Sequence, residues 1–483
     1  MNWLEKQALE KPDKRFVNAL TFSEVYELTA DLAARLSTYV QNQCRVALFS
    51  NNSERMILIF LSLQLLQKEV LLLNTRLTET EIEEQCEKLD IRLVIAQNNK
   101  TFPSLAAKNG ITDARQWLLF DEIFSRYAAK SDPGGDDITI SADKVSLAEE
   151  FRPEQIAVIM NTSATTGDFK SVPLRWKQFL AHVQASQQCL GMSNQDNWLM
   201  VLPMYHISGL TILLRSLYNG TSVTVMERFD EEQTVSLIKN GTVNMLSVVP
   251  TMLSRIIDRI QEHHLRLVLT GGEFIPEPLV EKCLNKRIPI YKTYGMTETT
   301  SQAVTFSVLE FPEKKAAVGK ALPHVKLRIS NPDSDGSGEV HIASPMVMDG
   351  YLGKEPVKGY FNTEDIGYLD DEGFLYILDR RKNIIISGGE NIYPREIEST
   401  LYQHPDMVEC AVVSRKDPVW GQVPVLFAVT SMDTEAIRQY LGTYLAKYKL
   451  PRDIILLTEL PRNATGKIAR KDLEKMAEDY YRE

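Results

Sequence analysis

The sequence predicts an α/β protein with a large N-terminal domain of parallel-rich sheets flanked by helices plus a β-region, and a small α+β C-terminal domain. Two observations predict this class. Strand-like apolar runs alternate with amphipathic helical patterns, which indicates parallel strands covered on both faces. The 483 residues also exceed the size at which one hydrophobic core stops growing. We therefore expect two domains, residues 1–381 and 382–483.

The first elements of the large domain carry recognisable start signals. Thr21 and Glu24 form a capping box that opens a helix, and Thr78 and Glu81 form another. The apolar run Met56–Leu66 predicts a further helix. The strand-like runs that alternate with such segments are Arg45–Ser50, Glu69–Asn74, Arg92–Ala96, Ile156–Met160, Ser222–Met226, Asn244–Val249 and Arg266–Thr270.

Patterns in the rest of the sequence predict first the β-region and then the small domain. The turn-rich stretch Asn331–Gly338 introduces a β-hairpin, and Asp132–Asp137 is typical of a surface loop. The expected strands of the small domain are Val408–Val413, Val423–Val429 and Asp453–Thr458, and its expected helices are Pro394–Gln403, Thr434–Ala446 and Arg470–Tyr481.

Composition excludes several classes of protein. The net charge of -10 argues against a nucleic-acid partner, although a local pocket for anions need not follow the global sign. The five dispersed cysteines have no zinc-site spacing and are typical of reduced thiols. The start has no apolar signal segment, and the longest apolar stretch is too short to span a bilayer. These features predict a cytoplasmic protein without an integral membrane segment.

A polar loop after a buried strand is the first candidate site. The run Asn161–Val172 is rich in Thr, Ser and Gly and contains Lys170, so its hydroxyls, backbone N–H groups and cation suit a phosphate. It is not a Walker A loop, because the required spacing is absent. From these residues alone, a polar turn without a ligand explains the segment equally well.

This loop resembles the phosphate-binding loop of the adenylate-forming enzymes, the superfamily of acyl-CoA synthetases, peptide-synthetase adenylation domains and luciferases. The usual form is T-S-G-T-T-G-x-P-K-G. The chain departs from it at Ala164, Phe169 and Ser171. The residues that it keeps, and that the resemblance assigns to ATP, are Thr162, Ser163, Thr165, Thr166, Gly167 and Lys170.

Further motifs of the same family follow in the expected order. Gly271, Gly272 and Glu273 match the segment against which adenine lies. The run Tyr294–Glu298 matches the adenine and magnesium motif, and the resemblance assigns Gly295 to cofactor binding. The resemblance implies that Tyr294 stacks on adenine, Thr297 touches the phosphate and Glu298 holds Mg²⁺, a cation that prefers oxygen ligands. A simple loop is the alternative for this turn.

The carboxyl-terminal motifs complete the resemblance. In Thr363–Asp365 the family's glycine is replaced by Glu364, and Asp365 is expected on the ribose with Arg380. Lys382 matches the pivot between the domains, and the small domain is expected to be mobile. The turn Ser387, Gly388 and Gly389 matches the pantetheine tunnel for coenzyme A. Lys467 matches the lysine that neutralises charge during adenylation; the alternative is an ordinary surface lysine.

The acid pocket is expected around Leu202–Leu210, where the family places a gating histidine or aromatic residue. The finer pattern resembles one branch, the o-succinylbenzoyl-CoA synthetases of menaquinone biosynthesis, whose acid has an aromatic ring and a second carboxylate. Arg215 is a candidate for that carboxylate, with a structural ion pair as the alternative. The other candidate residues for the acid are His206, Ser208, Gly209, Ser301 and Gln302.

The resemblance implies an AMP-forming acid–CoA ligase that uses ATP, Mg²⁺ and coenzyme A, with o-succinylbenzoate as the acid. Its catalytic residues would be Lys467, Glu298, Thr297 and His206. The alternatives are another aryl- or medium-chain acyl-CoA ligase, a peptide-synthetase adenylation domain, or a weakly active nucleotide-binding homologue. The sequence leaves open whether the chain forms a homo-oligomer.

Overall fold

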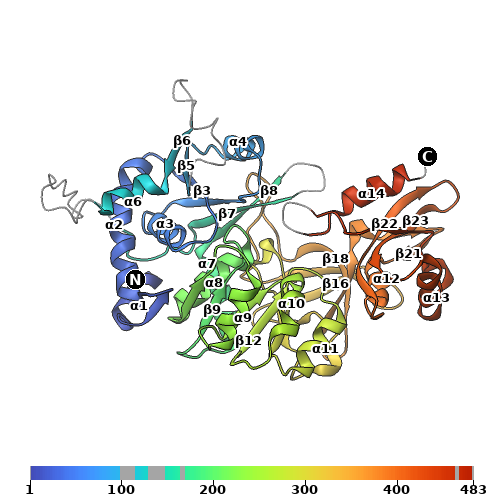
Figure 1. Cartoon of the computed structure of the whole chain (residues 1–483). Coiled ribbons are helices and arrows are strands. Elements are labelled where there is room, and N and C mark those ends of the chain that lie inside the picture. Colours follow the sequence, from blue (N-terminus) through green and yellow to red (C-terminus); the bar gives the residue numbers. More distant parts are fainter. Residues whose placement is uncertain (1, 98–114, 129–146, 164–168, 463–466, 481–483) are drawn as a thin grey trace, which may run out of the picture.

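The computed structural model contains three β-sheets with helices packed around them (Figure 1). It describes residues 2–97, 115–128, 147–163, 169–462 and 467–480. The predicted surface loop at 132–137 and the predicted phosphate ligands Thr165, Thr166 and Gly167 lie outside the described residues. Within the described residues, no helix is long and apolar enough to cross a membrane.

The first sheet is formed mainly by the N-terminal part of the chain. Its six strands lie in the order β6-β5-β3-β4-β7-β8, and all pairs are parallel except β7 with β8. The strands are β3 (Arg45–Phe49), β4 (Glu69–Leu73), β5 (Leu93–Ala96), β6 (Gln116–Leu119), β7 (Ile156–Ser163) and β8 (Phe169–Arg175). The helices of this part are α1 (Trp3–Glu10), α2 (Phe22–Val40), α3 (Glu54–Leu65), α4 (Glu79–Lys88), α6 (Phe120–Ala128) and α7 (Trp176–Leu190). Both predicted capping boxes are confirmed, at the starts of α2 and α4.

The second sheet has thirteen strands and two halves of different character. The parallel half runs β13-β12-β11-β9-β10-β1, and the antiparallel half continues from β13 through β14, β15, β19, β18, β17 and β16. The strands of the parallel half and its edge are β1 (Arg15–Val17), β2 (Leu20–Thr21), β9 (Asn197–Met200), β10 (Ser222–Val225), β11 (Met245–Val248), β12 (Leu267–Gly271) and β13 (Ile290–Tyr294). The antiparallel strands are β14 (Val304–Ser307), β15 (Gly319–Ala321), β16 (Lys326–Ser330), β17 (Gly338–Ala343), β18 (Phe361–Leu369) and β19 (Phe374–Arg380).

Four helices and a hairpin belong to this second sheet. The helices are α8 (Ile207–Asn219), α9 (Glu231–Lys239), α10 (Pro250–Ile256) and α11 (Glu277–Asn285). The predicted hairpin around Asn331–Gly338 is confirmed, because β16 and β17 pair antiparallel on either side of it. One buried apolar cluster joins residues of α2, α3, α7 and α8, so the two sheets share a core. The shared core therefore fixes the position of the first sheet relative to the second.

The third sheet forms a smaller C-terminal unit, residues 385–479, drawn in orange and red in Figure 1. Its strands are β20 (Ile385–Ser387), β21 (Glu390–Ile392), β22 (Met407–Asp417), β23 (Gly421–Thr430) and β24 (Asp453–Leu456). Its helices are α12 (Pro394–Leu401), α13 (Thr434–Tyr444) and α14 (Arg470–Asp479), each ending two residues earlier than predicted. Two apolar clusters consist only of residues from this unit, so it has a core of its own. The α/β class with a smaller C-terminal unit is thus confirmed, and the boundary at 381/382 stays a prediction.

Candidate active site

Two predicted motifs meet where neighbouring parallel strands end. The strands β12 and β13 pair in register, with Gly271 opposite Thr293, so the glycine pair and the Tyr294 turn lie side by side. A Cβ on Gly271 would lie 2.4 Å from the carbonyl oxygen of Thr293, so only glycine fits there. Gly272 has φ of +83° and open space around its Cα. The carboxyl edge of a parallel sheet with exposed backbone is a common place for a flat ligand.

The turn after β13 is fixed by its own backbone and by a neighbouring loop. A Cβ on Gly295 would lie 1.6 Å from the carbonyl oxygen of Ser301, which explains the glycine. The Met348 N–H donates to the carbonyl oxygen of Glu298 at 2.8 Å, and the Thr300 hydroxyl donates to that of Met346 at 2.7 Å. The turn therefore holds Glu298 in one position, as the predicted metal ligand requires.

The carboxylate of Glu298 is buried and is linked through Tyr351 to Lys170 of the predicted phosphate loop. The Tyr351 hydroxyl donates to Glu298 Oε1 at 3.0 Å, and Lys170 Nζ lies 5.1 Å from the centre of the Tyr351 ring. Burial, together with the charge of Glu298, raises the pKa of Tyr351, so this tyrosine remains a donor. Sequence reasoning missed Tyr351; its only signal was its place after the Asp349–Gly350 turn.

These residues fit a magnesium ion whose remaining ligands are phosphate oxygens of a bound nucleotide and water. Among the described residues, no group of three or more His, Cys, Asp and Glu side chains could hold a metal by itself. Mg²⁺ usually keeps several waters and binds through one or two carboxylates plus phosphate oxygens. A single buried Glu298 beside the strand that carries Lys170 meets that requirement.

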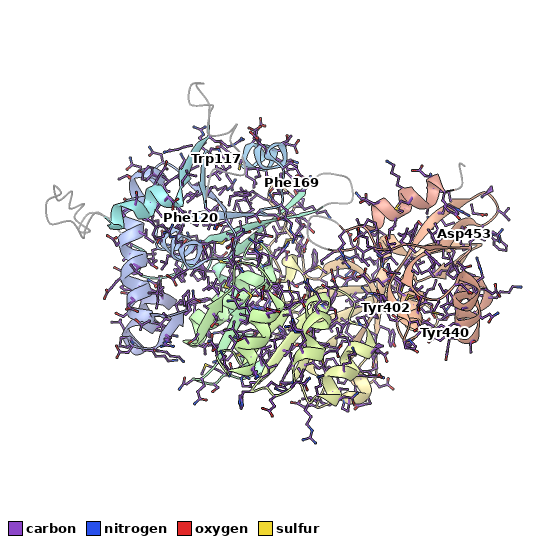
Figure 2. All side chains as sticks on the ribbon, viewed as in Figure 1. Trp117, Phe120, Phe169, Tyr402, Tyr440 and Asp453 are labelled. Atoms are coloured by element: carbon purple, nitrogen blue, oxygen red, sulfur yellow. The ribbon has the colours of Figure 1, made fainter. Side chains whose placement is uncertain are left out.

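The hairpin of β7 and β8 carries the described part of the predicted phosphate loop. Thr162 pairs with Lys170 across the hairpin, and its hydroxyl lies 3.4 Å from the Lys170 carbonyl oxygen. Ser171, where the family has glycine, donates from its hydroxyl to Asn161 Oδ1 at 2.7 Å. Phe169, labelled in Figure 2, begins β8 and lies 4.6 Å from the Lys88 ammonium. The departures from the family pattern at Phe169 and Ser171 therefore make local contacts.

Tyr294, Asp365 and Arg380 form what we call the nucleotide cluster. The Tyr294 hydroxyl donates to Asp365 Oδ2 at 2.5 Å, and Arg380 Nε lies 3.3 Å from Asp365 Oδ1. Asp365 and Arg380 are partners across β18 and β19. Burial raises the pKa of Asp365, and the Arg380 charge opposes that shift. Glu364, where the family has glycine, adopts the left-handed conformation with φ of +62°. Adenine stacking on Tyr294 stays a prediction.

Lys467 reaches this edge from the C-terminal unit. Its Nζ donates to the carbonyl oxygen of Gly272 at 2.9 Å. Burial lowers the pKa of Lys467, while the neighbouring Glu273 carboxylate acts in the opposite direction. Burial also raises the pKa of Glu273. The structure thus brings together Lys467, Gly272 and Glu273, which the sequence places almost 200 residues apart.

The C-terminal unit contacts the large sheet beside the predicted hinge. Tyr402, which directly follows α12 and is labelled in Figure 2, lies with its ring 6.2 Å from that of Phe274. The Arg395 guanidinium lies 5.6 Å from the same Phe274 ring. Buried Asp379 accepts from Arg380 N at 2.7 Å, Asn383 Nδ2 at 2.8 Å and Arg395 N at 2.9 Å. Lys382 lies exposed in the short turn between Asp379 and β20.

The predicted pantetheine turn makes its contacts within the C-terminal unit. Ser387 ends β20, and Gly388 and Gly389 follow with φ of +60° and +89°. The Gly388 N–H donates to the Trp420 carbonyl oxygen at 2.9 Å, and a Cβ on Gly388 would lie 2.7 Å from the Trp420 ring. In this arrangement it is Lys467, rather than the glycine turn, that meets the Gly272 edge.

The predicted acid pocket begins at the N-terminus of α8. A Cβ on Gly209 would lie 2.1 Å from the Pro203 carbonyl oxygen, so glycine lets the helix approach the end of β9 closely. His206 is the residue that precedes α8, and Ser208 lies in its first turn. The pKa of His206 is lowered to about 4, mainly by burial and to a smaller extent by the charges of Lys467 and Arg76. His206 is therefore neutral at pH 7 and lies near Lys467.

Arg215 lies further along α8 and is only 3% exposed. Its guanidinium lies 5.5 Å from the Trp198 ring, and its Nε and Nη1 have no hydrogen-bond partner among the described residues. Burial lowers its pKa to about 9. Gln302 accepts from the Ser186 hydroxyl at 2.9 Å, while its Nε2 has no described partner. Ser301 stands in the preceding turn with φ of +85°. The structural ion pair considered for Arg215 is absent among the described residues.

Comparisons with known proteins show the family to which the chain belongs. Residues 4–352 match the family model described as AMP-binding enzyme, and residues 396–467 match the AMP-binding enzyme C-terminal domain. The chain is similar to the 2-succinylbenzoate–CoA ligase of Lactococcus lactis subsp. lactis (strain IL1403), with 48% identity over 474 residues that cover 98% of this chain and 100% of that protein.

Solved structures of a second relative cover almost the whole chain. The o-succinylbenzoate CoA synthetase from Bacillus subtilis in complex with its acyl-adenylate intermediate has a TM-score of 0.88 and 32% identity, covering 98% of both chains. The same relative in complex with ATP and magnesium ion has a TM-score of 0.85 and 32% identity, covering 98% of this chain and 99% of that one.

Proposed function

Because the chain belongs to the AMP-binding enzyme family, with full-length relatives among the 2-succinylbenzoate–CoA ligases, we propose that it joins 2-succinylbenzoate to coenzyme A with ATP. The reaction forms an acyl-adenylate and pyrophosphate, and then acyl-CoA and AMP, as a step of menaquinone biosynthesis. A cytoplasmic location and the lack of a nucleic-acid partner stay predictions.

The observation that carries the proposal is the position of Lys467. Its ammonium donates to Gly272 at the strand edge, beside the nucleotide cluster and the N-terminus of α8. The acid carboxylate and the triphosphate repel each other, so their meeting point needs a cation. Lys467 comes from the C-terminal unit to this edge, and its ammonium donates directly to the Gly272 carbonyl oxygen. Its position supports adenylate formation in the arrangement described.

In the first half-reaction, one oxygen of the acid carboxylate attacks the α-phosphorus of ATP. The bond from the α-phosphorus to the pyrophosphate oxygen breaks, and pyrophosphate leaves with its electron pair. No nucleophilic side chain is needed, since the residues position the reactants and neutralise charge. Lys467 stabilises the charge that builds between carboxylate and phosphate, and Asp365 and Arg380 orient the ribose. A magnesium ion held by Glu298 would reduce the negative charge of the phosphates.

In the second half-reaction, the thiol of coenzyme A gives its proton to water and its sulfur bonds to the acyl carbonyl carbon. The bond from that carbon to the phosphate oxygen breaks, and AMP leaves with the electron pair. We assign the proximity of Lys467 to the first step only, so the second step needs a different face of the C-terminal unit. A rotation at Lys382 would replace Lys467 by the turn of Ser387, Gly388 and Gly389. The exposed position of Lys382 between two folded parts supports this assignment.

The acid is assigned from the α8 pocket. Neutral His206 lies at the mouth, near Lys467, and does not add charge where the carboxylate reacts. Arg215 lies deeper with two unpartnered nitrogens, so it suits the second carboxylate of a dicarboxylic acid. An acid with one carboxylate would leave this guanidinium buried without a counter-charge.

Two measurements test the proposal. AMP formation with coenzyme A is compared for 2-succinylbenzoate, benzoate and hexanoate, and we expect turnover with the first acid only. Lys467→Ala should lower the rate of adenylate formation about 10²- to 10³-fold, while thioester formation from preformed adenylate stays within about threefold of the wild type. Lys475→Ala, an exposed lysine on α14, serves as control. Equal loss of both half-reactions would refute the role of Lys467, and turnover of hexanoate alone would refute the assigned acid.

A further inference from the structure

A set of buried polar atoms without partners lies between α7 and α8. It includes both ring nitrogens of His182, Nε and Nη1 of Arg215, and Nε2 of Gln302. His182 is fully buried, and Gln302 is 1% exposed. A buried polar group that lacks its hydrogen bond costs about 1–3 kcal/mol. Several of these groups in one place therefore lower the stability of the free protein unless water or a ligand supplies the missing hydrogen bonds.

These residues converge on one place from three separate segments. His182 and Ser186 are one helical turn apart on α7, so they share a helix face. The Ser186 hydroxyl donates to Gln302 Oε1 at 2.9 Å, which joins that face to the turn after β13. Ser186 also lines the same cavity as Arg215 and Trp198. The Arg215 charge helps to lower the pKa of His182, so the two side chains are near each other. We call His182, Ser186, Arg215 and Gln302 the deep cluster.

The described acidic residue that lines this cavity, Asp196, already forms an ion pair with Arg266. Asp196 lines the cavity, but its two oxygens accept from Arg266 Nε and Nη2, both at 2.7 Å. No described carboxylate pairs with Arg215. The Trp198 ring contacts the guanidinium but offers it no hydrogen-bond acceptor. The deep cluster thus carries a positive charge that no described carboxylate neutralises, and several of its nitrogens have no described partner; Asn219 Oδ1, which lines the same cavity, is a buried acceptor without a described partner.

We propose that His182 determines acid specificity by donating a ring N–H to the second carboxylate of the substrate, beside Arg215 and Gln302. The ligand class is a dicarboxylic acid whose unreactive carboxylate enters the deep cluster. This inference rests on the proposed function, because it takes the acid of that reaction as the ligand. His182 has no part in the bond-making steps, so it is a specificity-determining residue.

Burial and Arg215 favour the neutral imidazole, which has one N–H donor and one acceptor nitrogen. A neutral donor adds a hydrogen bond to the carboxylate without a second buried charge. Hydrogen bonds to charged groups contribute more than bonds between neutral groups. Losing this bond should therefore weaken binding of the dicarboxylate and leave an acid that lacks the second carboxylate nearly unaffected.

The experiment compares three acids: 2-succinylbenzoate, 4-oxo-4-phenylbutanoate, which lacks the ring carboxylate, and 2-butanoylbenzoate, which lacks the tail carboxylate. The monoacid that the wild type converts identifies the reactive carboxylate. For His182→Leu we expect KM for 2-succinylbenzoate to rise about 10- to 100-fold, with kcat and the KM for the converted monoacid changed by less than about threefold. His182→Asn keeps an N–H donor, so its KM should lie between those of the wild type and His182→Leu.

The outcomes separate this inference from the proposed function. His341→Leu, a histidine on β17, is the control and should leave all KM values unchanged. Proportional loss with the dicarboxylate and the monoacid would show that His182 acts only on folding, and an unchanged KM for the dicarboxylate would equally overturn the inference. If His182→Leu does not fold, His182→Asn decides between the same outcomes. A wild type that forms no AMP with 2-succinylbenzoate would instead refute the proposed function.

Discussion

The two ends of the candidate site differ in how their polar groups are satisfied. In the nucleotide cluster, Asp365 receives the Tyr294 hydroxyl at 2.5 Å and lies 3.3 Å from Arg380 Nε. In the deep cluster, Arg215 and His182 have nitrogens without described partners. In the first set the charged groups pair with one another before a ligand binds, whereas in the second set no described carboxylate pairs with Arg215.

This difference indicates two ways of recognising a ligand. A satisfied network holds its geometry and binds by shape and exchange of hydrogen bonds with water. An unsatisfied, buried set of donors lowers the stability of the free protein and binds strongly the one ligand that supplies the missing charge. Removing a side chain should therefore affect stability in opposite directions at the two ends.

Replacing the buried guanidinium tests this contrast with the largest expected effect. Arg215→Met should raise KM for 2-succinylbenzoate about 10²- to 10³-fold, because a buried charge pair with the acid is lost. The KM for ATP should stay constant, and the free energy of unfolding should rise, since an unpaired buried charge is removed. Steady-state kinetics and denaturant unfolding measure both, and a large fall in stability would contradict the contrast.

The corresponding change at the nucleotide end is Asp365→Asn. It keeps the shape but removes the charge that Tyr294 and Arg380 contact, so we expect KM for ATP to rise about 10- to 100-fold. The free energy of unfolding should fall by about 1–3 kcal/mol, and KM for the acid should change little. Asp371→Asn, at an exposed position, is the control. An equal rise in the KM values for ATP and for the acid would contradict the proposed difference between the nucleotide cluster and the deep cluster.

His206, at the mouth of the proposed acid pocket, gives a pH-dependent test. Burial lowers the pKa of folded His206 to about 4, while an unfolded histidine titrates near 6.5, so the unfolded chain binds more protons between these values. Stability linked to His206 is complete above about pH 7 and is lost as the pH falls toward 4. As the pH falls over this range, the free energy of unfolding of His206→Asn should therefore decrease by about 1–3 kcal/mol less than that of the wild type. Denaturant unfolding at pH 7.5 and 4.5 measures this, and parallel curves would refute it.

The smallest effect is expected at the contact between the C-terminal unit and the large sheet. Arg395→Ala removes the cation–π contact with Phe274, which is worth about 0.5–1 kcal/mol. The rate of adenylate formation should fall about two- to fivefold, with both KM values unchanged. A change in the KM of only one substrate would instead assign Arg395 to the binding of that substrate.

The sequence predicted the elements and the contiguous motifs well. Alternating apolar runs correspond to β3, β4, β5 and β12, and the capping boxes open α2 and α4 as expected. Helix periodicity does not define the last turn, where backbone bonds are incomplete, so the C-terminal helices end earlier than predicted. Short-range pattern also contains no strand order, so the thirteen-stranded continuation through the antiparallel half was not predicted.

The parts of the site that depend on contacts between distant segments were not predicted. Tyr351 joins Glu298 only because the 346–351 loop packs on the turn after β13. His182 has the pattern of an ordinary helical position, and its missing partners become evident only when α7, α8 and Gln302 are placed together. Motifs of adjacent residues are visible in one dimension, whereas a deficit of hydrogen bonds is a property of the packed interior.

Asp379 gives the hinge an energetic preference. Its Oδ1 binds Arg380 and Asn383, and its Oδ2 binds the backbone N–H of Arg395 in the first turn of α12. Arg380 stays with the large sheet, but Arg395 would travel with the C-terminal unit in the proposed rotation. The rotation would then detach one oxygen of a buried carboxylate from its donor and expose it to water. We therefore expect the orientation with Lys467 at Gly272 to be the resting one, to which the C-terminal unit returns after each release of product.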